Sequence, residues 1–152
     1  MDKHSAPQPI IIARNVDKRF GSFYALRGVS ASFLEGQVTA IVGPSGSGKS
    51  TLLNIIGGID RADSGQITIE GELMEKMTVK RLSQYRRKHL GYVFQMYNLI
   101  PNLTVRENIE VGAYLSDHAL DVDELLDTLG LSAHQKKLPN QLSGGQQQRV
   151  AI

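Results

Sequence analysis

The sequence predicts a mixed α/β fold up to about residue 95, followed by an all-helical part from residue 96 to residue 152. In the first part, short runs of β-branched and apolar residues are separated by turn residues. From Thr104 onward the pattern becomes helical, with two capped helix starts. We therefore predict two domains, an α/β core at residues 1–95 and a helical subdomain at residues 96–152.

Five runs in the first part have the composition of β-strands. Ile10–Val16, which is rich in β-branched residues, and Val29–Leu34 are both expected to be strands. Gln66–Glu70 alternates polar and apolar residues, as a half-exposed strand does. Val38–Val42 is apolar on both faces, which predicts a strand buried in the centre of a sheet, and Leu90–Phe94 is expected to be another strand.

Four helices have recognisable start or stop signals. Lys49–Ile56 is expected to end at Gly57-Gly58, and Thr78 can cap a basic helix that runs through Lys88. Thr104 and Asp121 are each followed by an acidic residue at the third position, which is the pattern of a capped helix start.

The composition is that of a globular protein and excludes several classes. The 152 residues suffice for one ordinary core, with 41% hydrophobic and 21% charged residues. A net charge of +2 is too small to indicate a nucleic-acid partner. The absence of cysteine excludes disulfides and thiolate metal sites. We expect neither a signal peptide nor a membrane span, because no apolar run approaches the roughly 20 residues that a span needs.

A phosphate-binding loop follows the third predicted strand. Gly43 to Ser50 form a complete G-x-x-x-x-G-K-S motif between a strand and a helix. Its glycines let backbone N–H groups turn toward an anion, and the helix start adds unpaired N–H groups. Lys49 is expected to reach the β- and γ-phosphates and Ser50 to coordinate Mg²⁺. The alternative, a flexible Gly/Ser linker with a chance lysine, is disfavoured by the flanking strand and helix. The predicted nucleotide-binding residues here are Gly43, Pro44, Ser45, Gly46, Ser47, Gly48, Lys49, Ser50 and Thr51.

A second candidate anion site begins at Ser143. Ser143 and Gln146 form a capping box, so a helix should begin at Ser143. Gly144 and Gly145 occupy its first turn, at a cost of about 1 kcal/mol each relative to alanine. They leave the backbone N–H groups accessible beside the serine hydroxyl. The alternative is an ordinary glycine-rich helix start.

These segments together resemble a known family. The phosphate loop, Phe94-Gln95 after a predicted strand, and Leu142–Gln146 occur in the order and approximate spacing of ATP-binding cassette (ABC) proteins. The resemblance extends from Ile10 to Ile152. It implies a P-loop NTPase cassette with a partial parallel core sheet, an N-terminal antiparallel β subdomain and an all-helical signature subdomain.

The resemblance also implies roles for single residues and a partner. In the family, the signature segment of one subunit caps the γ-phosphate held by the other, so two subunits close head-to-tail over two ATP-Mg as a homodimer. Gln95 resembles the glutamine that contacts Mg²⁺ and the attacking water, which makes Gln95 and Lys49 the expected catalytic residues, with Ser50 and Gln95 as metal ligands. Phe20 matches the aromatic residue that stacks on adenine, although Phe23 or Tyr24 could stack instead.

Two sequence segments, Gly43–Gly58 and Gly91–Asn108, resemble one branch of the family. This branch comprises the lipoprotein-releasing, macrolide and antimicrobial-peptide exporters of bacteria. The resemblance implies a separate transmembrane permease that is received near Met96–Asn108. It also implies a peripheral location on the cytoplasmic face of the plasma membrane.

The chain departs from the family pattern after Arg149. It ends at Ile152, before the strand ending in Asp-Glu and the switch histidine that the family carries. We therefore expect a truncated cassette that lacks the C-terminal part of its core. Its full-length parent is expected to be an ATPase, and the 152 residues alone are not expected to be competent.

Other cassette functions remain as alternatives. A DNA-repair or chromosome cassette needs a long coiled coil, but the interval Gln95–Ser143 has no sustained heptads. A soluble translation-type cassette would need a second cassette in the same gene. A non-enzymatic nucleotide-binding remnant is the remaining alternative.

Overall fold

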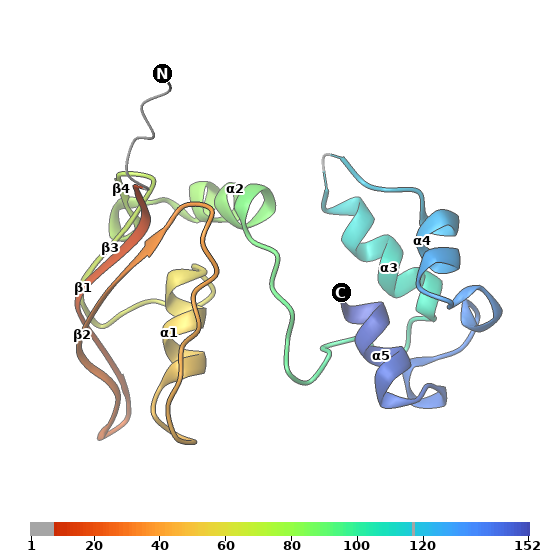
Figure 1. The fold of residues 1–152 in the computed structure, drawn as a ribbon, viewed down its shortest axis with the longest axis horizontal. Coiled ribbons are helices and arrows are strands. Elements are labelled where there is room, and N and C mark those ends of the chain that lie inside the picture. The colour runs from red at the N-terminus through yellow and green to blue at the C-terminus, as the bar shows by residue number, and fades with distance from the viewer. Residues whose placement is uncertain (1–7, 117) are drawn as a thin grey trace. The chain divides into compact units, whose positions relative to one another are not determined.

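The computed structural model describes residues 8–116 and 118–152, which form two compact units (Figure 1). The first unit runs to Arg86 and the second from Arg87 to Ile152. Each unit is described by itself below. The predicted functional division into residues 1–95 and 96–152 stays a prediction.

The first unit contains a four-stranded antiparallel sheet with the strand order β2-β1-β3-β4. Its longest strands form a hairpin in which Phe20 pairs with Phe23, and Gly21 makes the turn at a φ of 62°. The strands are β1 (Pro9–Phe20), β2 (Phe23–Leu34), β3 (Ser64–Ile69) and β4 (Glu72–Leu73).

Helix α1 (Lys49–Ile56) supplies the second layer of this unit. Its buried residues Leu52, Ile55 and Ile56 are three and four positions apart, so they share one helix face. That face belongs to the same core as Val16 and Ile67 of the sheet. The 3-10 helix η1 (Met74–Lys76) and helix α2 (Val79–His89) add Met74, Leu82 and Tyr85 to this core.

All regular secondary structure in the described residues of the second unit is helical, as the sequence predicts for residues 96–152. Five core residues lie on or beside its helices: Val105, Leu126, Leu131, Leu142 and Val150. The helices are α3 (Val105–Tyr114), α4 (Val122–Thr128), η2 (Ser132–His134), η3 (Pro139–Gln141) and α5 (Gly144–Ala151).

The predicted helix starts are confirmed by their side-chain caps. Thr104 and Ser143 both form complete capping boxes. The Asp121 carboxylate accepts a hydrogen bond from the N–H of Glu124, and the Thr78 hydroxyl accepts one from Arg81 at 3.2 Å. Helix α1 begins and ends where the sequence predicts.

Two predicted strands are wrong. Val38–Val42 and Leu90–Phe94 form no strand in the structure, and Val38 and Val42 are 102% and 89% exposed. An apolar run becomes a buried strand only where other strands pair with it and both faces are covered. Within the described residues the sheet ends at β2 and β4, so the predicted parallel part of the sheet is not formed. The strands β1 and β2 are longer than predicted, and only Gly21 and Ser22 connect them.

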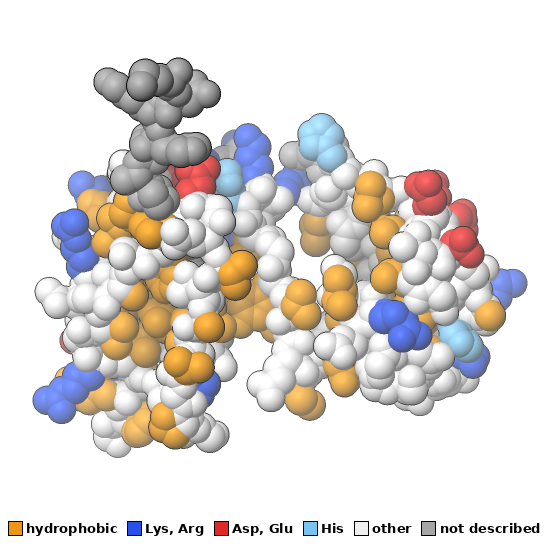
Figure 2. All heavy atoms as spheres, in the orientation of Figure 1, with side chains coloured by type: hydrophobic (Ala, Val, Ile, Leu, Met, Phe, Trp, Pro, Cys, Tyr) orange, Lys and Arg blue, Asp and Glu red, His pale blue; other side chains and the backbone are white. Residues whose placement is uncertain are grey.

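Hydrophobic side chains reach the surface of both units in Figure 2. The largest exposures include those of Val38, Val42 and Tyr114. No helix among residues 8–116 and 118–152 is both long enough and apolar enough to cross a bilayer.

The end of β1 is joined to the segment after α1 by polar contacts. The Asp17 carboxylate accepts hydrogen bonds from the N–H of Gly28 at 2.6 Å and the hydroxyl of Ser64 at 2.9 Å. These bonds lower the pKa of Asp17. The pKa of Asp60 is lowered in the same way by its hydrogen bond from Lys18.

We predict that these two carboxylates make the first unit sensitive to acid. Their folded-state pKa values lie below the unfolded value of about 3.9. Their stabilisation is therefore complete above about pH 4 and is lost as the pH falls through the folded pKa values. The free energy of unfolding, measured by urea titration at pH 7, 4 and 3, should decrease below about pH 4.

The control is the double variant Asp17→Asn with Asp60→Asn. It should be less stable at pH 7 and should lose less stability on acidification. An equally steep decline in the double variant would contradict the assignment to these groups.

Candidate functional site

The loop from Gly43 to Gly48 leads directly into α1. Gly48 is the N-cap of the helix, at a φ of 86°, in the left-handed region that L side chains rarely adopt. A Cβ atom at Gly48 would lie 2.3 Å from the carbonyl oxygen of Ala25 and 2.9 Å from Leu26 Cδ2. Glycine is therefore required at position 48 both for its backbone conformation and for its close approach to β2.

The N-terminus of α1 is suited to an anion. Among the residues that the structure describes, no side chain caps this end of the helix, and its first turn has no acidic residue. Its first backbone N–H groups lie before any possible intrahelical acceptor, and the helix dipole adds partial positive charge. These features fit the phosphate groups that the motif predicts.

Lys49 contributes the cation of this loop. Its Nζ donates hydrogen bonds to the carbonyl oxygens of Gly43 at 3.0 Å and Pro44 at 2.7 Å, so the ammonium group lies against the loop. Ser47 closes the turn by donating its N–H to Pro44 O at 3.3 Å. An anion bound at the loop would therefore meet a positive charge as well as backbone donors.

Ser50 and Thr51 follow in the first turn of α1. Ser50 is exposed and Thr51 is half-buried. A hydroxyl oxygen is the kind of hard ligand that Mg²⁺ accepts together with phosphate oxygens, so Ser50 fits a magnesium ion that accompanies a nucleotide. Gln95, the second predicted ligand, is an exposed turn residue of the second unit.

The signature segment forms the start of α5. The Ser143 hydroxyl accepts the Gln146 N–H at 3.3 Å, and Gln146 Oε1 accepts the Ser143 N–H at 2.8 Å. Ser143, Gly144 and Gly145 are exposed. The capping box satisfies two backbone donors, and the glycines keep the remaining first-turn backbone accessible to a ligand.

Tyr97, within the segment predicted to receive the permease, lies beside this helix start, a contact that was not predicted from the sequence. Its hydroxyl is 3.2 Å from the position that a Cβ of Gly144 would take. Tyr97 and Asn98, two and three positions after Gln95, both have a positive φ, at 58° and 52°. No sequence signal reports this contact, because it joins residues far apart in the chain.

Three aromatic residues lie at the turn of the β1–β2 hairpin, and they differ in exposure. Phe20 and Phe23 are 56% and 61% exposed and face each other across the ladder. The ring of Tyr24 is contacted by the guanidinium groups of Arg19 at 3.9 Å and Arg27 at 5.3 Å. The surfaces of Phe20 and Phe23 are therefore the more available for stacking.

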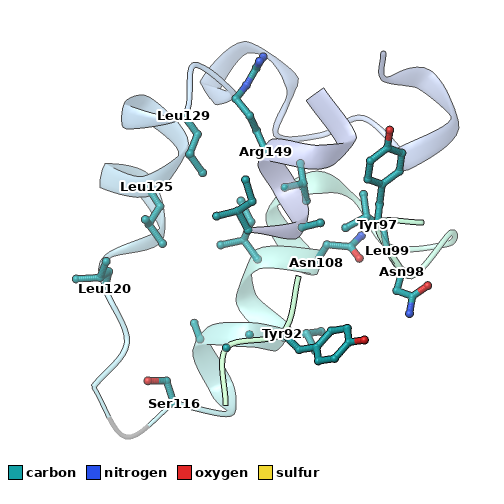
Figure 3. Close-up of a pocket in the computed structure, with 18 of the residues that line it drawn as sticks. Tyr92, Tyr97, Asn98, Leu99, Asn108, Ser116, Leu120, Leu125, Leu129 and Arg149 are labelled. Atoms are coloured by element: carbon teal, nitrogen blue, oxygen red, sulfur yellow. The ribbon is translucent and has the colours of Figure 1, made fainter. Parts of the chain in front are cut away.

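The second unit also contains a pocket of about 720 Å³ (Figure 3). Leu99 and Asn108 line it from the segment predicted to receive the permease, and Leu125 of α4 and the C-cap residue Leu129 also line it. Asn108 also fixes this segment. Its Nδ2 donates to the carbonyls of Ile100, Leu103 and Thr104, and its Oδ1 accepts from the Ile100 N–H.

A sheet, a glycine loop with its lysine and a second glycine-rich helix start define a P-loop nucleotide-binding cassette. The family model described as ABC transporter matches residues 26–152. The chain therefore belongs to the ABC transporter family, and the predicted family and mixed α/β cassette fold are confirmed, apart from the parallel part of the core sheet.

Three known proteins illustrate the similarity. The ABC transporter ATP-binding protein MG065 homolog of Mycoplasma pneumoniae is 52% identical over 130 residues, or 84% of this chain and 28% of that protein. The lipoprotein-releasing system ATP-binding protein LolD of Bacteroides fragilis is 40% identical over 148 residues, or 94% of this chain and 68% of LolD. A dimeric structure of the ATP-binding cassette MJ0796, in a post-hydrolysis state bound to ADP and Pi, has a TM-score of 0.80 and 40% identity, covering 93% of this chain and 66% of that one.

We predict that Gly48→Ala destabilises the protein more than Gly46→Ala. Both glycines have a positive φ, but a Cβ at Gly46 meets nothing within 4 Å, whereas one at Gly48 meets Ala25 O at 2.3 Å. Gly46→Ala should cost about 1–2 kcal/mol of backbone strain. Gly48→Ala should cost about 2–5 kcal/mol, because overpacking adds to the strain. Urea denaturation of the two variants tests the difference, and equal losses would argue against the close approach to β2.

Proposed function

We propose that this protein is the ATP-binding and ATP-hydrolysing subunit of a bacterial ABC transporter. The observation that carries the proposal is the phosphate loop, with its uncapped helix N-terminus and the Lys49 ammonium group against it. The family match and the similarity to LolD support the transport role. Lys49 and the α1 N–H groups would hold the β- and γ-phosphates, and the Ser50 hydroxyl would hold Mg²⁺ with Gln95.

We propose that two copies close head-to-tail over two ATP-Mg. The exposed Ser143-Gly144-Gly145 turn would then read the phosphate held by the partner's loop. Such an arrangement has C₂ symmetry, so each copy gives and receives one contact. The solved dimer of the MJ0796 cassette supports this proposal. Export would use a separate membrane permease, with this subunit on the cytoplasmic face.

A narrower function is the second candidate for the 152 residues themselves. They contain no hydrophobic strand that ends in Asp-Glu, which is the pair expected to order Mg²⁺ and polarise the attacking water. We therefore propose that these residues alone bind nucleotide without turning it over.

Lys49→Ala should weaken the binding of ATP-Mg by more than about 2 kcal/mol, because it deletes the cation at the loop. Isothermal titration calorimetry measures the difference. Lys80→Ala, which removes an exposed lysine of α2, is the matched control and should bind as the parent does. Equal affinities of the parent and the Lys49 variant would reject the assignment of the loop.

Ser143→Arg should leave ATP binding by the monomer nearly intact and abolish ATP-driven dimerisation. The arginine would fill the exposed turn that the partner's nucleotide is proposed to enter. The test measures the sedimentation coefficient in the presence of ATP. It uses a cassette as long as its LolD relatives. Ser132→Arg, at an exposed serine of the same unit, is the control. Unchanged ATP-dependent dimers in the Ser143 variant would show that the composite site is wrong.

A further inference from the structure

We infer that Lys18 is a positioning residue for base recognition, because it fixes the Phe20 ring relative to the helix that carries the phosphate loop. This inference rests on the proposed function. It assigns the stacking role to Phe20 rather than to Phe23 or Tyr24, and it gives a function to Lys18, which is not among the residues predicted from the sequence to bind nucleotide.

The Lys18 side chain reaches across the first unit to the segment after α1. Its Nζ donates to Asp60 Oδ1 at 2.8 Å and to the carbonyl oxygen of Arg61 at 2.7 Å. The side chain is 11% exposed, whereas that of Asp60 is 36% exposed. A lysine this buried needs its charge paired, so its ammonium group has a fixed place.

Asp60 is itself fixed to the C-terminal end of α1. The N–H groups of Ile59 and Asp60 both donate to the carbonyl oxygen of Asn54, at 2.8 and 3.1 Å. The Asp60 carboxylate also accepts the N–H of Arg61 at 2.7 Å. The anchor of Lys18 is therefore continuous with the helix whose other end bears the phosphate loop (Figure 1).

The same ammonium group contacts the ring of Phe20. Lys18 Nζ lies over the Phe20 ring, 5.4 Å from its centroid, within the distance of a cation–π interaction. Lys18 and Phe20 are two positions apart on β1, which places them on one side of the strand. The ring is 56% exposed, so it keeps surface for a nucleobase while the cation restrains it.

The neighbouring aromatics lack this combination. Tyr24 is contacted by two guanidinium groups, and the described residues include no cation over Phe23. Phe20 alone of the three couples an exposed ring to a link with α1. Because the base site and the phosphate site then form one rigid frame, the loss of Lys18 should affect the base and spare the phosphates.

The test compares the affinity of ATP-Mg with that of tripolyphosphate-Mg, which has the phosphates without the base. Lys18→Met keeps the apolar stem and removes the charge. It should weaken ATP binding about 3–10-fold and leave tripolyphosphate binding unchanged, since base stacking is the lost component. Lys18→Arg keeps a cation and should restore the affinity for ATP. Phe20→Ala should weaken ATP in the same way, and adding Lys18→Met to it should cause little further loss.

A role limited to stability predicts a different pattern. In that case, Lys18→Met would weaken both ligands equally, or neither, while lowering the melting temperature, and either result would overturn the inference. If Phe20→Ala leaves the ratio of the two affinities unchanged, Phe20 is not the stacking residue and the inference also fails. Both failures are distinct from failure of the proposed function, which would appear as insensitivity of ATP binding to Lys49→Ala.

Asp60→Asn provides a second route if Lys18→Met does not fold. It keeps the lysine but weakens its anchor. It should lower the ratio of ATP affinity to tripolyphosphate affinity in the same direction, and an unchanged ratio would overturn the inference.

Discussion

The contact of Gly48 with β2 is the constraint on which the first unit depends. The backbone of the loop approaches Ala25 so closely that a single added carbon atom would lie 2.3 Å from its carbonyl oxygen. This approach sets where α1 begins, and the buried face of α1 then fixes the helix on the core that it shares with the sheet. The positions of Lys49, Ser50 and the first N–H groups of α1 all follow from it. If the loop lay farther from β2, the chain would still contain the motif, but Lys49, Ser50 and the start of α1 would not be held in the same positions relative to the sheet.

The helices were predictable because their signals are local. Thr104, Asp121 and Ser143 accept hydrogen bonds from N–H groups only three residues away. The residues that determine each helix start therefore lie within one turn of the sequence. The strands Val38–Val42 and Leu90–Phe94 were not predictable in this way, because a strand needs partners that its own residues do not specify. The phosphate loop was found from its motif. Lys18 and the contact of Tyr97 with Gly144 were missed because they involve residues distant in the chain.

The two glycine-rich helix starts treat their backbone donors differently. The start of α1 has a glycine cap and no side-chain acceptor among the described residues, whereas the start of α5 satisfies two donors through Ser143 and Gln146. Helix α1 is therefore the stronger electrostatic site, with Lys49 adding a full charge. Helix α5 has a preformed start with less positive charge, which would suit the reversible contact with a second copy proposed above.

The amide of Asn108 has a mechanical consequence. Its four hydrogen bonds tie the backbone at Ile100, Leu103 and Thr104 to the first turns of α3. Hydrogen bonds from a side chain to the backbone take the place of backbone pairing in a loop and restrict its conformations. The backbone between Ile100 and Thr104 is therefore restrained against α3 by this one side chain. A displacement of the backbone at Ile100 would therefore move α3 with it, because Asn108 links the two by hydrogen bonds.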